Sequence, residues 1–496
     1  MSPYNHLEDH FARIGNLDDA VGLLHWDMST IMPKGGAGAR AEQMATLRRL
    51  RHSLVAAPEV ADLLNEAEAN NNLAPWQEAN LAEMRRAQIH ASAVEGKLIE
   101  ALSKACAACE MIWREARPAA DFARVRPALT EILRLGREVA AAKAEILECS
   151  PYEALLDEWE PGGRTHAIDP VFDDLANFLP DFTDQVLEAQ AKSPPARLPK
   201  GPFPAEKQRM LGEKLMAKLG FDFERGRLDQ SHHPFCGGAT DDVRITTRYD
   251  ENDFVEGLMA ILHETGHALY EFGLPKDWQR QPVGRARGMA MHESQSLLIE
   301  MQACRTKEFM MYAAPLMRKA FGGRGPDWGA SNLHRLYTRV QRSFIRTEAD
   351  EVTYPAHVIL RYRLEKAMVV GDLEIADLPG AFNDGLEALL GIRPPDDAKG
   401  CLQDIHWYAG AWGYFPTYTL GAIAAAQLFE AAKKANPEIL PSIGRGDFAP
   451  LLTWLRTNIH SKGSLQSMPD LLVAATGRKL DPKTYKSHLK ERYLNT

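Results

Sequence analysis

Two histidines and a glutamate stand close together in the sequence His263-Glu264-Thr265-Gly266-His267. Residues four positions apart on a helix lie on the same face, so the imidazoles of His263 and His267 could bind one metal ion. Glu264 would project beside the ion and could take a proton from a water molecule held there. This arrangement is typical of zinc-dependent peptidases. A match of this length also arises by chance in roughly a few per cent of chains of this size, so the motif alone is only suggestive.

The residues around this motif have the pattern of a helix with one buried face. Apolar side chains recur at helical spacing before the motif, at Phe254, Leu258, Ile261 and Leu262. An acidic or amide side chain could cap the start, the candidates being Asp250, Asn252 and Asp253. Gly273 followed by Pro275 should end the helix. The two histidines are therefore expected to be held on one rigid element.

A third metal ligand is expected at Glu293, in the stretch 288–304. A glutamate on a helix is usually solvated, but apolar residues surround this one, which favours burial: Met289, Met291, Leu297, Leu298 and Met301. A second helix packed on the first would then give two histidines, one glutamate and one open position. A third histidine of the metzincin type is excluded, because position 270 is Tyr and position 273 is Gly. Position 297, four residues after Glu293, is Leu rather than an aspartate that could orient a histidine, so that support must come from elsewhere.

Helical periodicity dominates the rest of the chain, for example in segments 38–56, 127–148 and 206–220. One short strand is expected at Val243–Arg248, within a small β element. The prolines of segment 192–204 forbid a continuous helix there. This break could separate two lobes or join two helices of one domain, so we expect one mainly helical body with either arrangement.

Composition narrows the classes of function. The 496 residues are 45% hydrophobic and 25% charged, which is ordinary for a globular protein with a large core. The formal charge of −9 and the scattered basic residues argue against nucleic acid as a partner. The N-terminus lacks the apolar segment of a signal peptide, and no apolar run is long enough to cross a membrane, so we expect a cytoplasmic protein. The six cysteines, including Cys106 and Cys109 in a CxxC, are expected to be reduced thiols.

Several further motifs resemble those of a known family, the carboxypeptidase Taq family of metallocarboxypeptidases. In order along the chain they are HPF at 233–235, DVRIT at 242–246, HETGH at 263–267, HESQ at 292–295, IRTEAD at 345–350 and GCLQDIHW at 400–407. They spread over about the last half of the chain, and the segment 23–40 is also similar to the family's opening segment. Six ordered motifs at compatible spacing are far more specific than any one of them.

This resemblance implies a fold, an activity and partners. The fold would be a mainly α, two-lobed helical body around a deep active-site cleft, similar to neurolysin and angiotensin-converting enzyme, with the small β element. Residues 1–496 would form one catalytic domain, with an N-terminal helical lobe at about 1–200 and a motif-bearing part at about 230–420. The activity would be removal of single residues from peptide C-termini, with broad side-chain tolerance and poor handling of proline. The enzyme would use zinc, with cobalt as a substitute, and would form a homodimer.

The resemblance also implies donors for the oxyanion that forms during hydrolysis. Related helical peptidases use a histidine and a tyrosine downstream of the metal ligands. His406 and Tyr418 are the candidates here, with Tyr414 as a substitute. Tyr408 lies in the same segment, and for any one of these tyrosines a packing role is an equal alternative.

An exopeptidase must also hold the terminal carboxylate of its substrate, and a guanidinium fits that group bidentately. Arg346 in the IRTEAD motif is the first candidate, since the family's corresponding segment is thought to close the end of the cleft. The alternative is a surface ion pair with Asp350 at i,i+4. Arg244 is the second candidate, although it could instead fix the cleft wall through Asp242. His233 could line the substrate groove or simply cap a loop before Pro234.

Two other functions compete with this interpretation. A zinc endopeptidase or dipeptidase would share the metal centre but would not need an arginine that clamps a terminal carboxylate. A non-catalytic scaffold would retain the fold but lose part of the site. The second alternative is disfavoured, because Glu264 and all three metal ligands are present.

Overall fold

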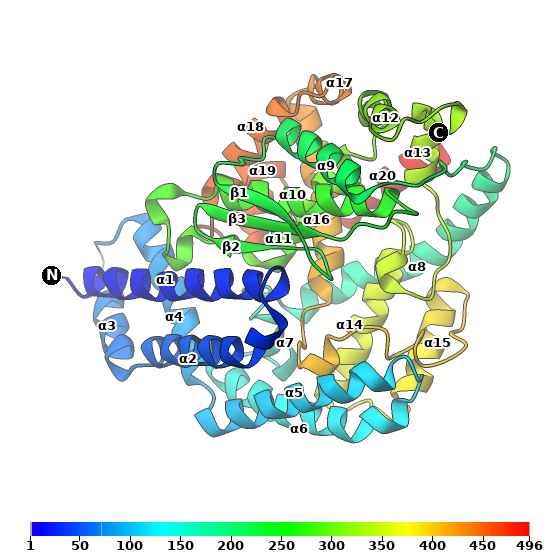
Figure 1. Cartoon of the computed structure of the whole chain (residues 1–496). Helices are drawn as coiled ribbons and strands as arrows, with labels where there is room; N and C mark the ends of the chain where they lie inside the picture. The colour runs from blue at the N-terminus through cyan, green and yellow to red at the C-terminus, as the bar shows by residue number, and fades with distance from the viewer. Residues whose placement is uncertain (1, 71, 496) are drawn as a thin grey trace.

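The computed structural model describes residues 2–70 and 72–495, and its architecture is dominated by helices (Figure 1). The helices that precede the sheet are α1 (Pro3–Ser29), α2 (Ala37–Val55), α3 (Pro58–Glu68), α4 (Pro75–Ser92), α5 (Gly96–Ala116), α6 (Phe122–Leu147), α7 (Pro151–Leu156), α8 (Thr165–Ala191) and α9 (Ala205–Leu219). Those that follow it are α10 (Val255–Gly273), α11 (Gly288–Leu297), α12 (Lys307–Phe321), α13 (Ala330–Tyr337), α14 (Tyr354–Val370), α15 (Leu378–Leu390), α16 (Pro416–Ala435), α17 (Ile439–Gly444), α18 (Ala449–Asn458), α19 (Met468–Thr476) and α20 (Pro482–Leu494). A π-helical turn, Leu298–Ala303, continues directly from α11.

The helices follow the periodicity of the sequence closely. Segments 38–56, 127–148 and 206–220 lie in α2, α6 and α9, each within a few residues of the expected ends. The proline-rich segment runs without a helix from the end of α8 at Ala191 to the start of α9 at Ala205. The prediction of a mainly helical body is therefore confirmed.

The small β element is a three-stranded sheet of β1 (Gly226–Gln230), β2 (Phe235–Ala239) and β3 (Asp242–Thr247), in the order β1-β3-β2. β1 pairs parallel to β3, and β2 pairs antiparallel to it. The strand expected at Val243–Arg248 is thus found one residue earlier. One face of the sheet packs on α10, where Ile245 joins Ile261 and Ala268 in a small buried cluster. Helix α1 runs along β2 (Figure 1). The sheet therefore covers α10, and α1 covers the edge of the sheet.

Two larger clusters of apolar side chains make up most of the core. One extends from α5 to α20 and includes the helices around α16. The other lies among α1, α3 and α4 and is built around Tyr4, Phe11 and Leu64. The buried amide of Asn80 links this N-terminal cluster to the segment after α10, because it donates to the Tyr4 hydroxyl at 3.1 Å and to Gln281 Oε1 at 3.0 Å. All six cysteines are free thiols, as expected.

Helices α10 and α16 both pack against α11 near the centre of the molecule (Figure 1), and two glycines permit this close approach. A Cβ on Gly266 of α10 would lie 2.5 Å from the Gln295 carbonyl oxygen of α11. A Cβ on Gly421 of α16 would lie 2.8 Å from Cβ of Glu293, also on α11. Distances below 3.0 Å are not tolerated between such atoms, so any larger residue at either position would push α11 away.

The start of α10 differs from the expected capping. The N-cap residue is Phe254, which offers no side-chain hydrogen bond. Asp253 still binds the first turn, since its carboxylate accepts from the Val255 N–H at 2.7 Å, whereas Asp250 accepts from Asn252 in the preceding turn. The prediction that Asp250, Asn252 or Asp253 occupies the N-cap position was therefore wrong, because the buried Phe254 occupies it. The predicted end of α10 at Gly273 is confirmed. Among the described residues, no helix is long and apolar enough to span a bilayer.

The substitution Gly421→Ala is expected to lower the free energy of unfolding by about 1–3 kcal/mol, because its methyl group must overpack against the Glu293 side chain. Gly380→Ala is the matched control, since a Cβ on this helical glycine of α15 would meet no atom within 4 Å. It should be neutral or slightly stabilising. Urea denaturation of both metal-free variants checks the expectation, which would be contradicted by equal stability changes.

Candidate metal centre and active site

The three predicted metal ligands converge. One donor atom each from His263, His267 and Glu293 lies within 4.8 Å of the others. Oε2 of Glu293 lies 3.7 Å from Nε2 of His263 and 3.4 Å from Nε2 of His267. Both imidazoles therefore point the same nitrogen at one place, with the carboxylate completing a triangle.

This donor set fits a zinc ion, since two imidazoles and one carboxylate leave a fourth position for water or substrate. The Glu293 side chain is only 8% exposed, as the apolar residues around it predicted. Burial alone would raise its pKa, but the two imidazoles lower the pKa to about 2. Glu293 is thus a carboxylate in a dry site, where a cation would compensate its charge.

Glu264 lies on α10 between the two histidines and is 7% exposed. Burial raises the pKa of its carboxyl group to about 7, against the opposing effect of His263. A carboxyl group whose pKa lies near neutrality can both accept and return a proton, which is the property that a general base of a hydrolase needs.

The partner that orients His263 is Glu300, which the sequence did not reveal. Nδ1 of His263 lies 3.0 Å from Oε2 of Glu300, whose other oxygen accepts from Arg305 at 2.6 Å. Glu300 belongs to the π-helical turn Leu298–Ala303, which widens the helix after α11. The sequence signal for Glu300 is its seven-residue spacing from Glu293, since residues with this spacing share one face of a helix.

The C-terminal helix α20 holds this π-helical turn in place. Arg492 donates to the carbonyl oxygens of Met301 and Gln302, and Nε2 of His488 lies 3.2 Å from the Gln302 amide nitrogen. The carboxylate of the buried Glu351 lies 2.8 Å from Nε2 of His488 and accepts from Arg492 at 2.8 Å. The backbone that carries Glu300 is therefore fixed by contacts distant in sequence.

The partner of His267 is His292, from the predicted HESQ segment. The Nδ1 atoms of the two rings lie 2.6 Å apart, and Nε2 of His292 lies 2.7 Å from Oε1 of Glu271. The sequence places His292 in the HESQ motif without assigning it a role, and no motif includes Glu271. Each of the two histidines predicted to bind a metal thus has a different hydrogen-bonded chain behind it.

The predicted oxyanion donors form one aromatic cluster. The Tyr418 hydroxyl lies 3.5 Å from Nε2 of His406, and the Tyr414 and Tyr418 rings lie 5.2 Å apart. Tyr418 precedes Gly421 by one turn of α16, which places it beside Glu293. Burial lowers the pKa of His406 to about 4, so its imidazole is neutral near pH 7. Tyr408 is fully buried and donates to the Cys401 carbonyl, so the structure gives this tyrosine a packing role.

Arg346 joins this cluster from the loop before α14. Its guanidinium lies 5.1 Å from the centre of the Tyr418 ring, and the residue as a whole is 6% exposed. Nε and Nη2 donate to Oδ1 of Asp404 at 3.0 and 2.8 Å, and Nη1 donates to the Tyr354 hydroxyl at 2.7 Å. Arg361 donates to the other oxygen of Asp404 at 2.5 Å. Asp404 therefore anchors two buried arginines, and they lower its pKa although burial alone would raise it.

The alternative of an Arg346–Asp350 surface pair is wrong. Arg346 lies in the short 3₁₀ helix Arg346–Glu348 and is buried, so the i,i+4 geometry of an α-helix does not exist here. Asp350 instead accepts hydrogen bonds from backbone N–H groups, including those of Gln341 and Val352. The sequence did not identify Asp404 or Tyr354 as the partners of Arg346.

Arg244 lies on β3 of the sheet, and His233 lies in the loop between β1 and β2. Arg244 donates bidentately to Asp242 at 2.9 and 2.6 Å, and its guanidinium stacks on Trp26 of α1 at 4.1 Å. This matches the alternative in which Arg244 fixes a wall through Asp242. His233 is exposed, and its carbonyl oxygen accepts from the Ser231 hydroxyl, which ties the loop before Pro234.

Comparison with known proteins agrees with this geometry. The family model described as carboxypeptidase Taq (M32) metallopeptidase matches residues 6–493. The chain is 37% identical to thermostable carboxypeptidase 1 of Thermus thermophilus, over 99% of this chain and 98% of that protein. It is 33% identical to carboxypeptidase 1 of Bacillus subtilis, over 98% and 97% of the two chains.

Solved structures are similar over the same extent. Trypanosoma cruzi metallocarboxypeptidase 1 superposes with a TM-score of 0.97 at 39% identity, covering 99% of both chains. The M32 carboxypeptidase of Deinococcus radiodurans gives a TM-score of 0.93 at 34% identity, covering 99% of this chain and 98% of the other. With the family model, the relatives and the site in agreement, this chain belongs to the carboxypeptidase Taq (M32) family and is a metallocarboxypeptidase.

Proposed function

We propose that this metallocarboxypeptidase uses zinc to remove single amino acids from the C-termini of peptides. The observation that carries the proposal is the convergence of His263, His267 and Glu293 beside the buried Glu264, with the Arg346 cluster adjacent to it. A general base and a guanidinium that can hold a carboxylate are the two groups that this reaction needs besides the metal.

Each residue then has a separate task. His263, His267 and Glu293 hold the zinc ion, which supplies Lewis acidity for the activation of water and the polarisation of a carbonyl group. Glu264 accepts the proton of the attacking water and returns it to the nitrogen of the leaving amino acid. His406 or Tyr418 donates a hydrogen bond to the developing oxyanion, and Tyr414 is the substitute.

Arg346 is the proposed clamp for the terminal carboxylate of the substrate. Asp404 accepts from Nε and Nη2 of its guanidinium and Tyr354 accepts from Nη1, which fixes the plane of the group and leaves one N–H bond of Nη1 and one of Nη2 for a carboxylate. A preorganised guanidinium binds at a lower cost in side-chain entropy than a free one. Its position beside Tyr418 favours exopeptidase activity over the endopeptidase or dipeptidase alternative.

Other features of the proposal rest on the family resemblance. They are a broad tolerance for side chains with poor activity before proline, cobalt as a substitute metal, and a homodimer. The proposal also includes a single catalytic domain with two lobes around a deep cleft, like that of neurolysin and angiotensin-converting enzyme, and a cytoplasmic location. Its substrates are peptides.

The substitution Glu264→Gln tests the general base. We expect kcat to fall about 10²–10⁴-fold while zinc binding is retained, since Gln keeps the shape of the side chain but cannot accept the proton. Chelation of the metal from the wild-type protein should abolish activity, and added zinc or cobalt should restore it.

Glu256→Gln is the matched control, because Glu256 is an exposed residue in the first turn of the same helix. It should leave kcat unchanged. Comparable activity in the Glu264→Gln variant and the wild type would contradict the assigned role of Glu264.

The clamp is tested with an unblocked peptide and its C-terminally amidated twin, followed by mass spectrometry. We expect the wild type to shorten only the unblocked peptide. Arg346→Gln should lower kcat/KM for that peptide about 30-fold or more, corresponding to about 2 kcal/mol or more for a lost buried charge pair. Zinc content and thermal unfolding are measured for each variant.

Arg244→Gln serves as the comparison, because Arg244 is the other candidate clamp and its bonds lie on the sheet. It should retain the discrimination between the two peptides. Selective loss in this variant would transfer the role to Arg244, and internal cleavage of both peptides by the wild type would favour the endopeptidase.

A further inference from the structure

The two metal-ligand histidines have unequal support. His263 donates toward a carboxylate, Glu300, that is itself held by Arg305 in a buried position. His267 has no carboxylate at the corresponding nitrogen. Its Nδ1 faces the Nδ1 of another histidine, His292, at 2.6 Å. This contact requires an explanation, because two imidazole nitrogens this close must share one proton.

The proton positions follow from the neighbours of each ring. Nε2 of His267 points to Glu293 and is the atom offered to the metal, so Nδ1 of His267 must carry the hydrogen. Nδ1 of His292 must then accept this hydrogen bond. The remaining hydrogen of a neutral His292 lies on Nε2, which is 2.7 Å from the Glu271 carboxylate. Both hydrogen bonds of this chain then join a donor to an acceptor.

We propose that His292 is a positioning residue for the metal ligand His267, and that Glu271 fixes the tautomer of His292 for this purpose. The proposal rests on the proposed function of the site as a zinc centre. The chain Glu271–His292–His267 places an imidazole between carboxylate and ligand where the other arm, Glu300–His263, has direct contact. Both chains of hydrogen bonds fix the orientation of the ligand imidazole and keep its Nε2 free of a proton.

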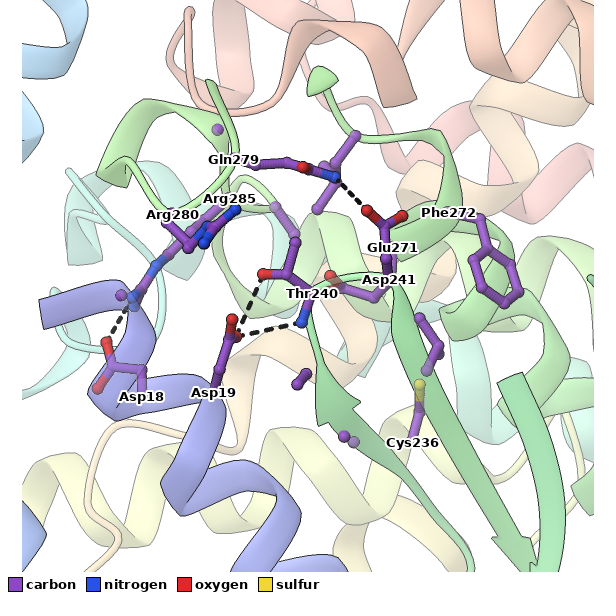
Figure 2. A pocket seen from close by; sticks show the side chains of 18 of the residues that line it. Asp18, Asp19, Cys236, Thr240, Asp241, Glu271, Phe272, Gln279, Arg280 and Arg285 are labelled. Carbon is purple, nitrogen blue, oxygen red and sulfur yellow. Dashed lines mark hydrogen bonds and ion pairs between the residues drawn. The ribbon is translucent and has the colours of Figure 1, made fainter. Parts of the chain in front are cut away.

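The outer end of the His292 arm faces a pocket of about 380 Å³ (Figure 2), lined by residues that include Glu271, His292, Cys236, Asp19 and Thr240. The other carboxylates labelled there already bind elsewhere. Asp19 accepts from Thr240, Asp18 binds Arg285, and Asp241 accepts from Gln279. Glu271 is the labelled carboxylate that binds an imidazole.

Of the two carboxylates that support the histidines, Glu271 is more exposed to solvent than Glu300. The Glu271 side chain is 35% exposed, against 10% for Glu300. A hydrogen bond to a solvated carboxylate contributes less than one to a buried carboxylate. The loss of Glu271 should therefore weaken metal binding less than the loss of His292, whose Nδ1 meets the metal ligand directly.

The test measures zinc affinity by competition with a chromogenic chelator, together with the visible spectrum of the Co²⁺ form. We expect His292→Phe to weaken zinc binding about 10–100-fold and to alter the cobalt spectrum, since Phe fills the space of the ring but accepts no hydrogen bond. His292→Asn should recover much of the affinity, because its amide oxygen lies near the position of Nδ1 and can accept from His267. Glu271→Gln should show a loss of only a few-fold.

His460→Phe is the matched control. The His460 ring packs on Tyr270 at 5.2 Å between ring centres, much as His292 does at 5.5 Å, but its Nε2 bonds Gln295 and not a metal ligand. Its zinc affinity should equal that of the wild type. Circular dichroism and thermal unfolding of the metal-free forms establish that each variant is folded.

Three outcomes would overturn the proposal. Unchanged zinc affinity and an unchanged cobalt spectrum in His292→Phe would exclude a positioning role, even if activity fell. Equal weakening in His292→Phe and His460→Phe would indicate a packing effect, as would an Asn variant no better than Phe. Failure of the wild type to bind one zinc ion would instead remove the proposed function itself, so the two failures are distinguishable.

Discussion

The close approach of α10, α11 and α16 is the constraint on which the site depends. Two of the proposed metal ligands stand on α10 and the third on α11, so the geometry of the proposed metal site is set by the distance between these helices. Gly266 and Gly421 permit that distance, since any Cβ would collide with α11 at both contacts. Tyr418 stands one turn before Gly421, so the same contact also places the candidate oxyanion donor beside Glu293. Gly266 and Gly421 are therefore required for the distance between the helices, although glycine is unfavourable within a helix.

Around these helices, the buried charges are arranged in compensated groups. Glu300 is bound by Arg305, Asp404 by two arginines, and Glu351 by His488 and Arg492. An unpaired charge in such positions would cost several kcal/mol, so each carboxylate keeps its partners in a fixed geometry. The metal ligands differ in one respect. Glu293 is paired with the imidazoles of His263 and His267 instead.

Much of the site could be predicted from the sequence, because its ligands lie on helices at recognisable spacing. His263, His267 and Glu293 meet where the periodicity and the surrounding apolar residues indicated, and the helices α2, α6 and α9 end within a few residues of expectation. The motifs gave Arg346 and Tyr418, which do lie together. These are local patterns, and local patterns survive in a single sequence.

The partners of these residues could not be predicted in the same way, because they depend on tertiary packing. Asp404 reaches Arg346 across 58 positions of sequence, and no periodicity connects them. Glu300 reaches His263 because the π-helical turn after α11 packs on α10, and the sequence alone does not show that packing. Arg346 was offered an α-helical partner at Asp350, although its segment folds as a short 3₁₀ helix. In each case the sequence shows which residues are present but not the backbone conformation that orients their side chains.

The attachment of α20 to the π-helical turn has a consequence for biosynthesis. Met301 and Arg492 are separated by 191 positions, yet the hydrogen bond from Arg492 to the Met301 carbonyl holds the backbone that carries Glu300. A chain emerging from the ribosome exposes its N-terminal segments first, so both histidines of α10 leave the ribosome long before α20. During that interval His263 lacks part of the framework that orients it. The docking of α20 would therefore be a late step in the ordering of the site.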